Sequence, residues 1–152
     1  MNIEKDLIHQ VFVAARDQGI SSVLFRNAIS RKLKLNATDA ECLSLLSIKG
    51  VSTPKDLAHY TGLTTGSTTA MLDRLEKLGF IRRTPNPHDR RGVIIEITQA
   101  YKDAAGPLVA DVQVAHRQLI SRYSDEELRI IIDFLTRFTD NVTKSTDKID
   151  KK

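Results

Sequence analysis

The chain contains two groups of residues whose chemistry suits contact with double-stranded DNA. Residues 64–69 read TTGSTT, and Arg90 and Arg91 stand in the segment PNPHDRRG at 85–92. A helix face of small, uncharged side chains fits against base edges in the major groove, where Ser and Thr hydroxyls donate or accept and threonine methyl groups touch thymine. Guanidinium groups on a projecting loop reach a flanking minor groove, where narrow A·T-rich sequence concentrates negative potential.

The hydroxyl-rich segment is predicted to open a helix, called the reading helix below. Thr64 is a candidate N-cap, and Met71, Leu75 and Leu78 recur at i, i+4 and i+7, which buries one stripe. Gly79 is expected to end the helix. The residues expected to face away from the core are Thr65, Gly66, Thr69 and Asp73.

A β-hairpin is predicted directly after the reading helix. Phe80–Thr84 and Val93–Ile97 are β-branched, partly alternating runs, and the segment between them forms a long tip that carries Arg90 and Arg91. Arginine pairs on loops are usually just solvated, but beside a reading helix they favour a DNA contact. A helix followed by such a hairpin is typical of a winged helix.

A short helix is predicted just before the reading helix. Residues 53–56 (TPKD) supply a cap, a proline at the first helical position and an acid in the first turn, and Gly62 ends the helix. Helix, glycine turn and helix form a helix-turn-helix, whose first helix lies across the DNA backbone. Free amides at the start of that helix favour a phosphate. The residues predicted to contact the backbone there are Ser52, Thr53 and Lys55.

Further helices are predicted on both sides of this unit. The segment 38–41 (TDAE) has the pattern of a capping box, which would open a helix through Leu43, Leu46 and Ile48. The segment 124–127 (SDEE) has the same pattern and precedes a broad hydrophobic stripe. These capping boxes are structural devices and carry no functional information.

Three local features are expected to limit the terminal helices. Gly19 is expected to interrupt the N-terminal helix, and Gly106-Pro107 to bend the helix that starts near Thr98. The polar tail from Val142 onward is expected to fray.

The terminal segments are predicted to pair with a second copy of the chain. A palindromic DNA site needs two reading helices about 34 Å apart, and the hydrophobic stripe after residue 124 is wider than a small winged helix can bury. An intramolecular bundle is the alternative. We assign 37–98 to the winged helix-turn-helix, and 1–36 and 99–152 to dimerisation helices. The residues expected at the interface are Leu7, Val11, Leu128, Ile131, Leu135 and Phe138.

The charge distribution agrees with a polyanionic partner. The chain has a formal net charge of +4 and a pI near 9.3. Within 74–91 six cations face two acids (6 − 2 = +4), so the local excess equals that of the whole chain. The cations in this window are Arg74, Lys77, Arg82, Arg83, Arg90 and Arg91, and the acids are Glu76 and Asp89. The electrostatic footprint is therefore expected on the winged helix.

Length and composition agree with the fold class that the patterns predict, a mainly α-helical protein with a small β-hairpin, and with a place in the cytoplasm. With 152 residues and 41% hydrophobic content, the chain can bury one sizeable core. The N-terminus lacks the pattern of a secretion signal, and no run approaches the ~20 apolar residues of a membrane span. Cys42 cannot form an internal disulfide; it is expected to be a small buried hydrophobe, with a thiol switch as the alternative.

An enzyme is the competing class, and few residues favour it. His9, His59, His88 and His116 are scattered, and the zinc-protease, P-loop and nucleophile-elbow patterns are absent from the sequence. We therefore expect no catalytic residues, no metal and no cofactor. A winged helix used only for protein contacts is a second alternative, but it would not need arginines at the tip or a small polar helix face.

The order of elements, together with the segment GLTTGSTTAMLDRLEKLGFIRRTPNPHDRRGVIIEIT at 62–98, resembles the MarR family of transcriptional regulators. Asp89-Arg90-Arg91-Gly92 is similar to the family's wing signature. The resemblance implies that Arg91 enters the minor groove, that Asp89 supports the wing and that Arg74 and Arg90 lie at the DNA backbone. By the same resemblance, the residues at the major groove are Thr65, Gly66, Ser67 and Thr69.

Regulation by a small-molecule effector is also implied by the resemblance. Family members bind such a ligand between the DNA-binding lobes and the dimer helices, which changes the spacing of the two reading helices, and repression is the expected outcome. Polar or reactive side chains that could line the cleft are Arg26, Cys42, Tyr60 and His9, although each also fits an ordinary surface or core position.

Overall fold

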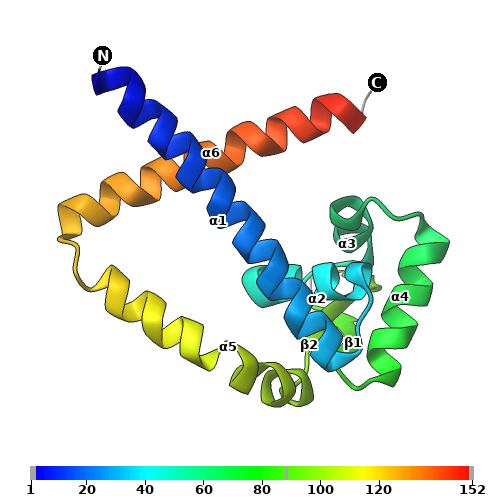
Figure 1. Ribbon diagram of the computed structural model, residues 1–152. Coiled ribbons are helices and arrows are strands. Elements are labelled where there is room, and N and C mark those ends of the chain that lie inside the picture. The colour runs from blue at the N-terminus through cyan, green and yellow to red at the C-terminus, as the bar shows by residue number, and fades with distance from the viewer. Residues whose placement is uncertain (1–2, 88, 151–152) are drawn as a thin grey trace. The chain divides into compact units, whose positions relative to one another are not determined.

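The computed structural model describes residues 3–87 and 89–150, without the side chains of 3–5, 90, 91 and 150. The chain divides into two compact units, Met1–Leu108 and Val109–Lys152. The helices and strands are labelled in Figure 1. In the first unit they are α1 (Ile3–Leu33), α2 (Ala37–Lys49), α3 (Pro54–Thr61), α4 (Thr65–Lys77), β1 (Ile81–Asn86), β2 (Asp89–Ile97) and the start of α5 (Gln99–Ile120). The rest of α5 and α6 (Asp125–Asp150) form the second unit.

The core of the first unit lies between α2, α3, α4 and the β-hairpin (Figure 1). The apolar side chains buried together there include Leu43, Leu46, Leu57, Met71, Leu75, Ile81 and Ile95. Two residues predicted to be buried in the core are not: Leu78 is 50% exposed and Ile48 is 80% exposed. Ile48 stands in the last turn of α2, and Leu78 is the C-cap that follows the last residue of α4. The predicted winged helix with mainly α-helical surroundings is confirmed.

Local caps fix where α3 and α4 begin and end. Thr53 and Asp56 form a reciprocal capping box at α3, and the Thr64 side chain accepts from the Ser67 amide at α4. Gly62 ends α3 with φ 66°, and Gly79 follows the C-cap of α4 with φ 73°. Both angles lie in the left-handed region that glycine adopts without steric cost. These four predictions are confirmed.

The predicted capping box at the start of α2 is wrong. α2 begins at Ala37, and the cap is Asn36, whose side-chain oxygen accepts from the Asp39 amide at 2.8 Å. Thr38 lies inside the first turn, so it cannot cap the helix. The Asp39 carboxylate is used elsewhere, in an ion pair with Arg74.

The hairpin is longer than the sequence predicts. β1 and β2 pair antiparallel from Ile81↔Ile97 to Pro85↔Val93, and the register then shifts so that Asn86 pairs with Asp89. Most of the predicted tip at 85–92 is therefore strand with a bulge in β2, because the extra residues on β2 are absorbed without opening the ladder. Ser52 joins the other side of β2 through an isolated bridge to Ile95.

α1 is one continuous helix, so the predicted interruption at Gly19 is wrong. A glycine inside a helix costs only about 1 kcal/mol, which the remaining hydrogen bonds of a 31-residue helix offset. Large apolar side chains on α1 are exposed, including Leu7, Val11 and Phe12.

The second unit confirms one prediction and corrects another. Ser124 and Glu127 form the expected capping box, since the Ser124 amide donates to the Glu127 carboxylate and the Glu127 amide donates to the Ser124 hydroxyl. The tail from Val142 does not fray, because α6 continues to Asp150. Its polar residues include Thr143 and Thr146, whose hydroxyls donate to carbonyls four residues earlier. Ile130, Ile132 and Leu135 are exposed on α6.

Candidate nucleic-acid interface

The N-terminal half of α4 presents a small polar surface. Thr65, Gly66, Ser67 and Thr69 are all exposed, whereas Thr68 is buried against the core. The Thr64 hydroxyl donates to the Ser67 hydroxyl at 3.0 Å, and the Thr69 hydroxyl donates to the Thr65 carbonyl at 3.0 Å. The four residues predicted at the major groove are therefore all open to solvent, with Thr65, Gly66 and Thr69 on one face and Ser67 at its edge.

A groove of about 550 Å³ runs beside this face, between α3, α4 and the hairpin. It brings together several predicted site residues from three elements, namely Thr53, Lys55, Thr65, Thr69 and Asp89. Ser52 is not among them: it is only 8% exposed, and its amide and carbonyl both bond to Ile95. Its hydroxyl therefore offers little surface to a phosphate.

The amides at the start of α3 are already used in part. The Thr53 amide donates to the Asp56 carboxylate and the Asp56 amide donates to the Thr53 hydroxyl, each at 3.2 Å. The Thr53 hydroxyl also donates to the Asp56 carboxylate at 2.7 Å, and this bond, together with the one from the Thr53 amide, holds the pKa of Asp56 below its ordinary value. A negative charge at this helix start weakens the attraction for a phosphate, so Lys55 is the stronger backbone candidate on α3.

Arg83 connects the reading helix α4 to the hairpin. Its guanidinium donates to Glu76 and, at 2.6 Å, to Asp73, both on α4. The Arg83 amide also donates to Glu76 at 3.3 Å. This arrangement fixes the base of the hairpin to the outer side of α4, and it offsets two carboxylates that would otherwise repel DNA phosphates.

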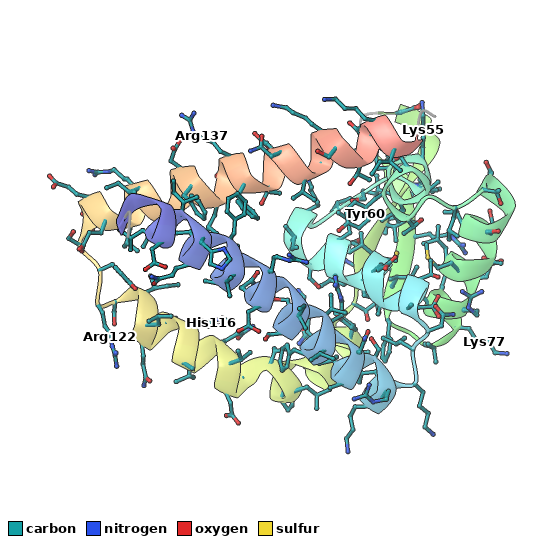
Figure 2. All side chains as sticks on the ribbon, turned by 45° about the horizontal axis from the view of Figure 1, so that its top comes forward. Lys55, Tyr60, Lys77, His116, Arg122 and Arg137 are labelled. Atoms are coloured by element: carbon teal, nitrogen blue, oxygen red, sulfur yellow. The ribbon has the colours of Figure 1, made fainter. Side chains whose placement is uncertain are left out.

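Of the four counted cations whose side chains the structure describes, three are paired with acids. Arg74 pairs with Asp39, Arg82 with Glu96, and Arg83 with two carboxylates of α4. Three of these acids, Asp39, Asp73 and Glu96, lie outside the window 74–91, so counting within that window missed them. The electrostatic footprint therefore depends on fewer cations than the sequence predicts. Figure 2 shows one of them, Lys77, projecting outward at the end of α4.

Arg74 holds α4 against the start of α2. Its Nη2 and Nε atoms donate to Asp39 at 2.7 and 3.4 Å, and hydrogen bonding to that carboxylate raises the pKa of Arg74. The Asp39 side chain is only 5% exposed, whereas that of Arg74 is half exposed. A buried carboxylate with this partner positions the helix, so Arg74 has a role in the fold, and its contact with the DNA backbone stays a prediction.

Replacing Arg74 with alanine should therefore destabilise the fold. The Asp39 carboxylate would stay buried without its partner, at a cost of about 1–3 kcal/mol, less than for a fully buried pair because Arg74 is half exposed. Urea unfolding followed by circular dichroism measures the change. Arg82→Ala is the control, because its pair with Glu96 is exposed and should matter little. If the Arg74→Ala protein is as stable as the parent but binds every duplex more weakly, Arg74 contacts the DNA backbone and is not needed for the fold.

The arginines at the tip of the hairpin lie in β2 by their backbone, and their side chains are outside the part of the structure that is described. Asp89 begins β2 and pairs with Asn86 across the hairpin. The minor-groove contact of Arg91, the backbone contact of Arg90 and the supporting role of Asp89 stay predictions.

Cys42 is fully buried in the core, as predicted. Burial, with a smaller contribution from the nearby Asp39 charge, raises the pKa of its thiol to about 12. The reactive thiolate is therefore almost absent at neutral pH, which disfavours the thiol-switch alternative.

We expect the Cys42 thiol to react with a disulfide reagent at neutral pH at least about a hundredfold more slowly in the folded protein than in denaturant. Absorbance of the released thiolate measures both rates. If Cys42 reacts rapidly and completely while the protein keeps the circular dichroism spectrum of its folded state, the thiol-switch alternative is supported.

The four residues proposed to line an effector cleft are not brought together. Cys42 of α2 lies in the hydrophobic core, whereas Tyr60, labelled in Figure 2, is exposed on α3. Tyr60 lines a separate hollow with residues of α2 and α3. His9 and Arg26 both belong to α1, about 25 Å apart at 1.5 Å per residue. Among the described residues no three His, Cys, Asp or Glu side chains are grouped to hold a metal ion. In the described part of the chain, every helix is too short or too polar to cross a membrane.

A helix-turn-helix followed by a two-stranded wing defines a winged-helix protein. The family model that matches is that of the MarR family, over residues 35–93. The HTH-type transcriptional regulator YcgE of Bacillus subtilis is 34% identical over 134 residues, covering 88% of this chain and 87% of that protein.

Two solved structures share the fold. NadR in complex with 4-hydroxyphenylacetate has a TM-score of 0.58 at 21% identity and covers 86% of this chain and 91% of its own. A MarR mutant from E. coli complexed with operator DNA has a TM-score of 0.50 at 23% identity and covers 87% and 95%. The chain belongs to the MarR family. Its relatives are named as transcriptional regulators, so the enzyme alternative is not supported.

Proposed function

We propose that this protein is a transcriptional regulator that binds a palindromic operator as a homodimer and represses until a small molecule releases it. One observation carries the proposal: α4 presents a small, exposed hydroxyl face beside the α3 start and the arginine-bearing wing. A helix with such a face, positioned by a helix-turn-helix, suits the major groove. The relatives' names and the operator DNA bound by the E. coli MarR mutant support the same function.

Each part of the site has a separate proposed role. Thr65, Gly66 and Thr69 of α4 lie at base edges, and Ser67 lies at the edge of that face. Lys55 and Thr53 contact the sugar-phosphate backbone of one DNA strand, and Arg90 contacts that of the other. Arg91 enters the flanking minor groove, with Asp89 supporting the wing.

Dimerisation is proposed through the terminal segments 1–36 and 99–152, with 37–98 as the DNA-binding part. The apolar side chains exposed on α1 and α6 support this, because large contiguous apolar patches on single chains mark interaction surfaces. A symmetric pair would present two reading helices to two half-sites. The residues proposed at the interface are Leu7, Val11, Leu128, Ile131, Leu135 and Phe138.

Control by a small molecule is proposed from the family, and the ligand bound by NadR shows that a protein of this fold can hold an aromatic acid. An effector would act by favouring one spacing of the two reading helices over another.

Selection of duplexes from a random library with the full chain tests the DNA-binding function. The selected duplex and a scrambled copy are then titrated at several salt concentrations. We expect the selected duplex to bind at least about a thousandfold more tightly, with affinity falling as salt rises. Equal, weak binding of both duplexes would contradict the proposal and favour a protein-interaction module.

A further inference from the structure

The centre of the outward face of α4 carries few donor groups in its first two turns, because the exposed Thr65 and Ser67 hydroxyls lie at its two edges. The buried side of the helix holds Thr68, Met71, Leu72 and Leu75. Opposite it, Gly66 and Ala70 are exposed four residues apart, and Thr69 flanks them beside the groove. Gly66, Thr69 and Ala70 therefore form the centre of the outward face.

The hydroxyl group of Thr69 donates its hydrogen bond within the protein, not outward. Thr69 donates to the Thr65 carbonyl at 3.0 Å, which leaves its oxygen as an acceptor and its γ-methyl group as an apolar contact. Ala70 adds a β-methyl group, and Gly66 adds no side chain. The centre of the face therefore offers methyl groups and an acceptor.

The neighbouring polar groups do not change this character. Asp73 follows on the same face, but its carboxylate accepts from Arg83 at 2.6 Å. Ser67 stands seven residues before Arg74, so it shares the side of the helix that faces Asp39 of α2. Guanine presents only acceptors in the major groove and is normally read by arginine or lysine, which the first two turns of α4 lack.

We infer that α4 selects its DNA sites through the 5-methyl group of thymine, which the methyl groups of Thr69 and Ala70 contact. This inference rests on the proposed function. An A·T pair matches the face, because thymine supplies the methyl group and adenine supplies an amino donor for the Thr69 oxygen. A G·C pair offers an amino donor without a methyl group, so the methyl contact makes the distinction.

Deoxyuridine provides the test, because it differs from thymidine only by the missing methyl group. A duplex selected with the parent protein is remade with single deoxyuridine substitutions, and each is titrated by fluorescence anisotropy at fixed salt. We expect deoxyuridine to weaken binding at one or two thymine positions per half-site, by about fourfold at each. This factor corresponds to roughly 0.8 kcal/mol per apolar carbon removed from contact. Deoxyuridine outside the half-sites is the control and should change affinity less than twofold.

Two variants of Thr69 separate the methyl group from the hydroxyl. Thr69→Ser keeps the hydrogen bond to the Thr65 carbonyl and removes the methyl group. At the thymine that Thr69 contacts, this variant should bind the thymidine and deoxyuridine duplexes equally well. Thr69→Val keeps the methyl group and removes the hydroxyl. It should therefore still bind the deoxyuridine duplex more weakly than the thymidine duplex, and bind the thymidine duplex within about threefold of the parent. Circular dichroism confirms that both variants are folded.

The outcomes distinguish the inference from the function on which it rests. A selected duplex that binds specifically but tolerates complete deoxyuridine substitution within twofold would overturn thymine reading and leave DNA binding intact. The same conclusion follows if Thr69→Val loses the sensitivity and Thr69→Ser keeps it, since the hydroxyl would then be the reading group. Failure to select any duplex would overturn both.

Discussion

Replacing Leu135 and Phe138 together with aspartate is expected to make the protein monomeric and to weaken binding to a two-half-site duplex by at least about a hundredfold. Leu135 is 56% exposed on α6 within the chain, although it belongs to an apolar stripe. If a second copy covers this stripe, two charges there would be buried without partners, at a cost of several kcal/mol. Each half-site would then be bound alone, and the gain from joint binding would be lost.

Sedimentation velocity measures the oligomeric state, and anisotropy measures the affinity for DNA. Thr136→Asp is the matched control: it adds a charge at the neighbouring exposed residue of the same helix, away from the stripe. This control should remain dimeric and bind normally. A soluble double mutant that also remains dimeric would move the proposed interface away from α6, leaving α1 as the next candidate.

The predictions that succeeded depend on interactions close in sequence. Caps such as Thr64 and Gly62 act within a few residues, so the residue type and its neighbours determine the result. The hairpin pattern likewise gave the right strands, although the bulge opposite Pro85 extended them into the expected tip. The register shift results from pairing between strands, which the alternation of residue types does not encode.

The features that escaped prediction join residues far apart. Asp39 and Arg74 are separated by 35 positions, so neither composition nor spacing indicates that they meet. The window 74–91, which includes Arg74 among its cations, excludes its partner Asp39. For Arg83, the acids Asp73 and Glu76 stand three residues apart on one helix face, which was a usable signal for a shared cation. The failure at Gly19 is different, because a single glycine only weakens a long helix.

Replacing Arg91 with alanine is expected to weaken operator binding about tenfold to a hundredfold while the fold and the oligomeric state are retained. The prediction follows from its place beside the tip of the wing and from the ion pairs of Arg74, Arg82 and Arg83, which leave fewer cations for DNA. An arginine in a narrow A·T-rich minor groove contributes on the order of 1–3 kcal/mol. The loss should therefore be larger on duplexes with A·T-rich flanks than on duplexes with G·C-rich flanks.

Two matched variants separate this role from simple charge. Arg90→Ala, at the neighbouring residue, should weaken all duplexes alike and lower the salt slope by about one, as loss of a phosphate contact does. Arg91→Lys keeps the charge but not the planar guanidinium, so it should recover the salt slope without the full preference for A·T-rich flanks. If Arg91→Ala binds within about twofold of the parent on both kinds of flank, the minor-groove assignment is wrong. If Arg90→Ala instead shows the flank dependence, then Arg90 is the residue that enters the groove.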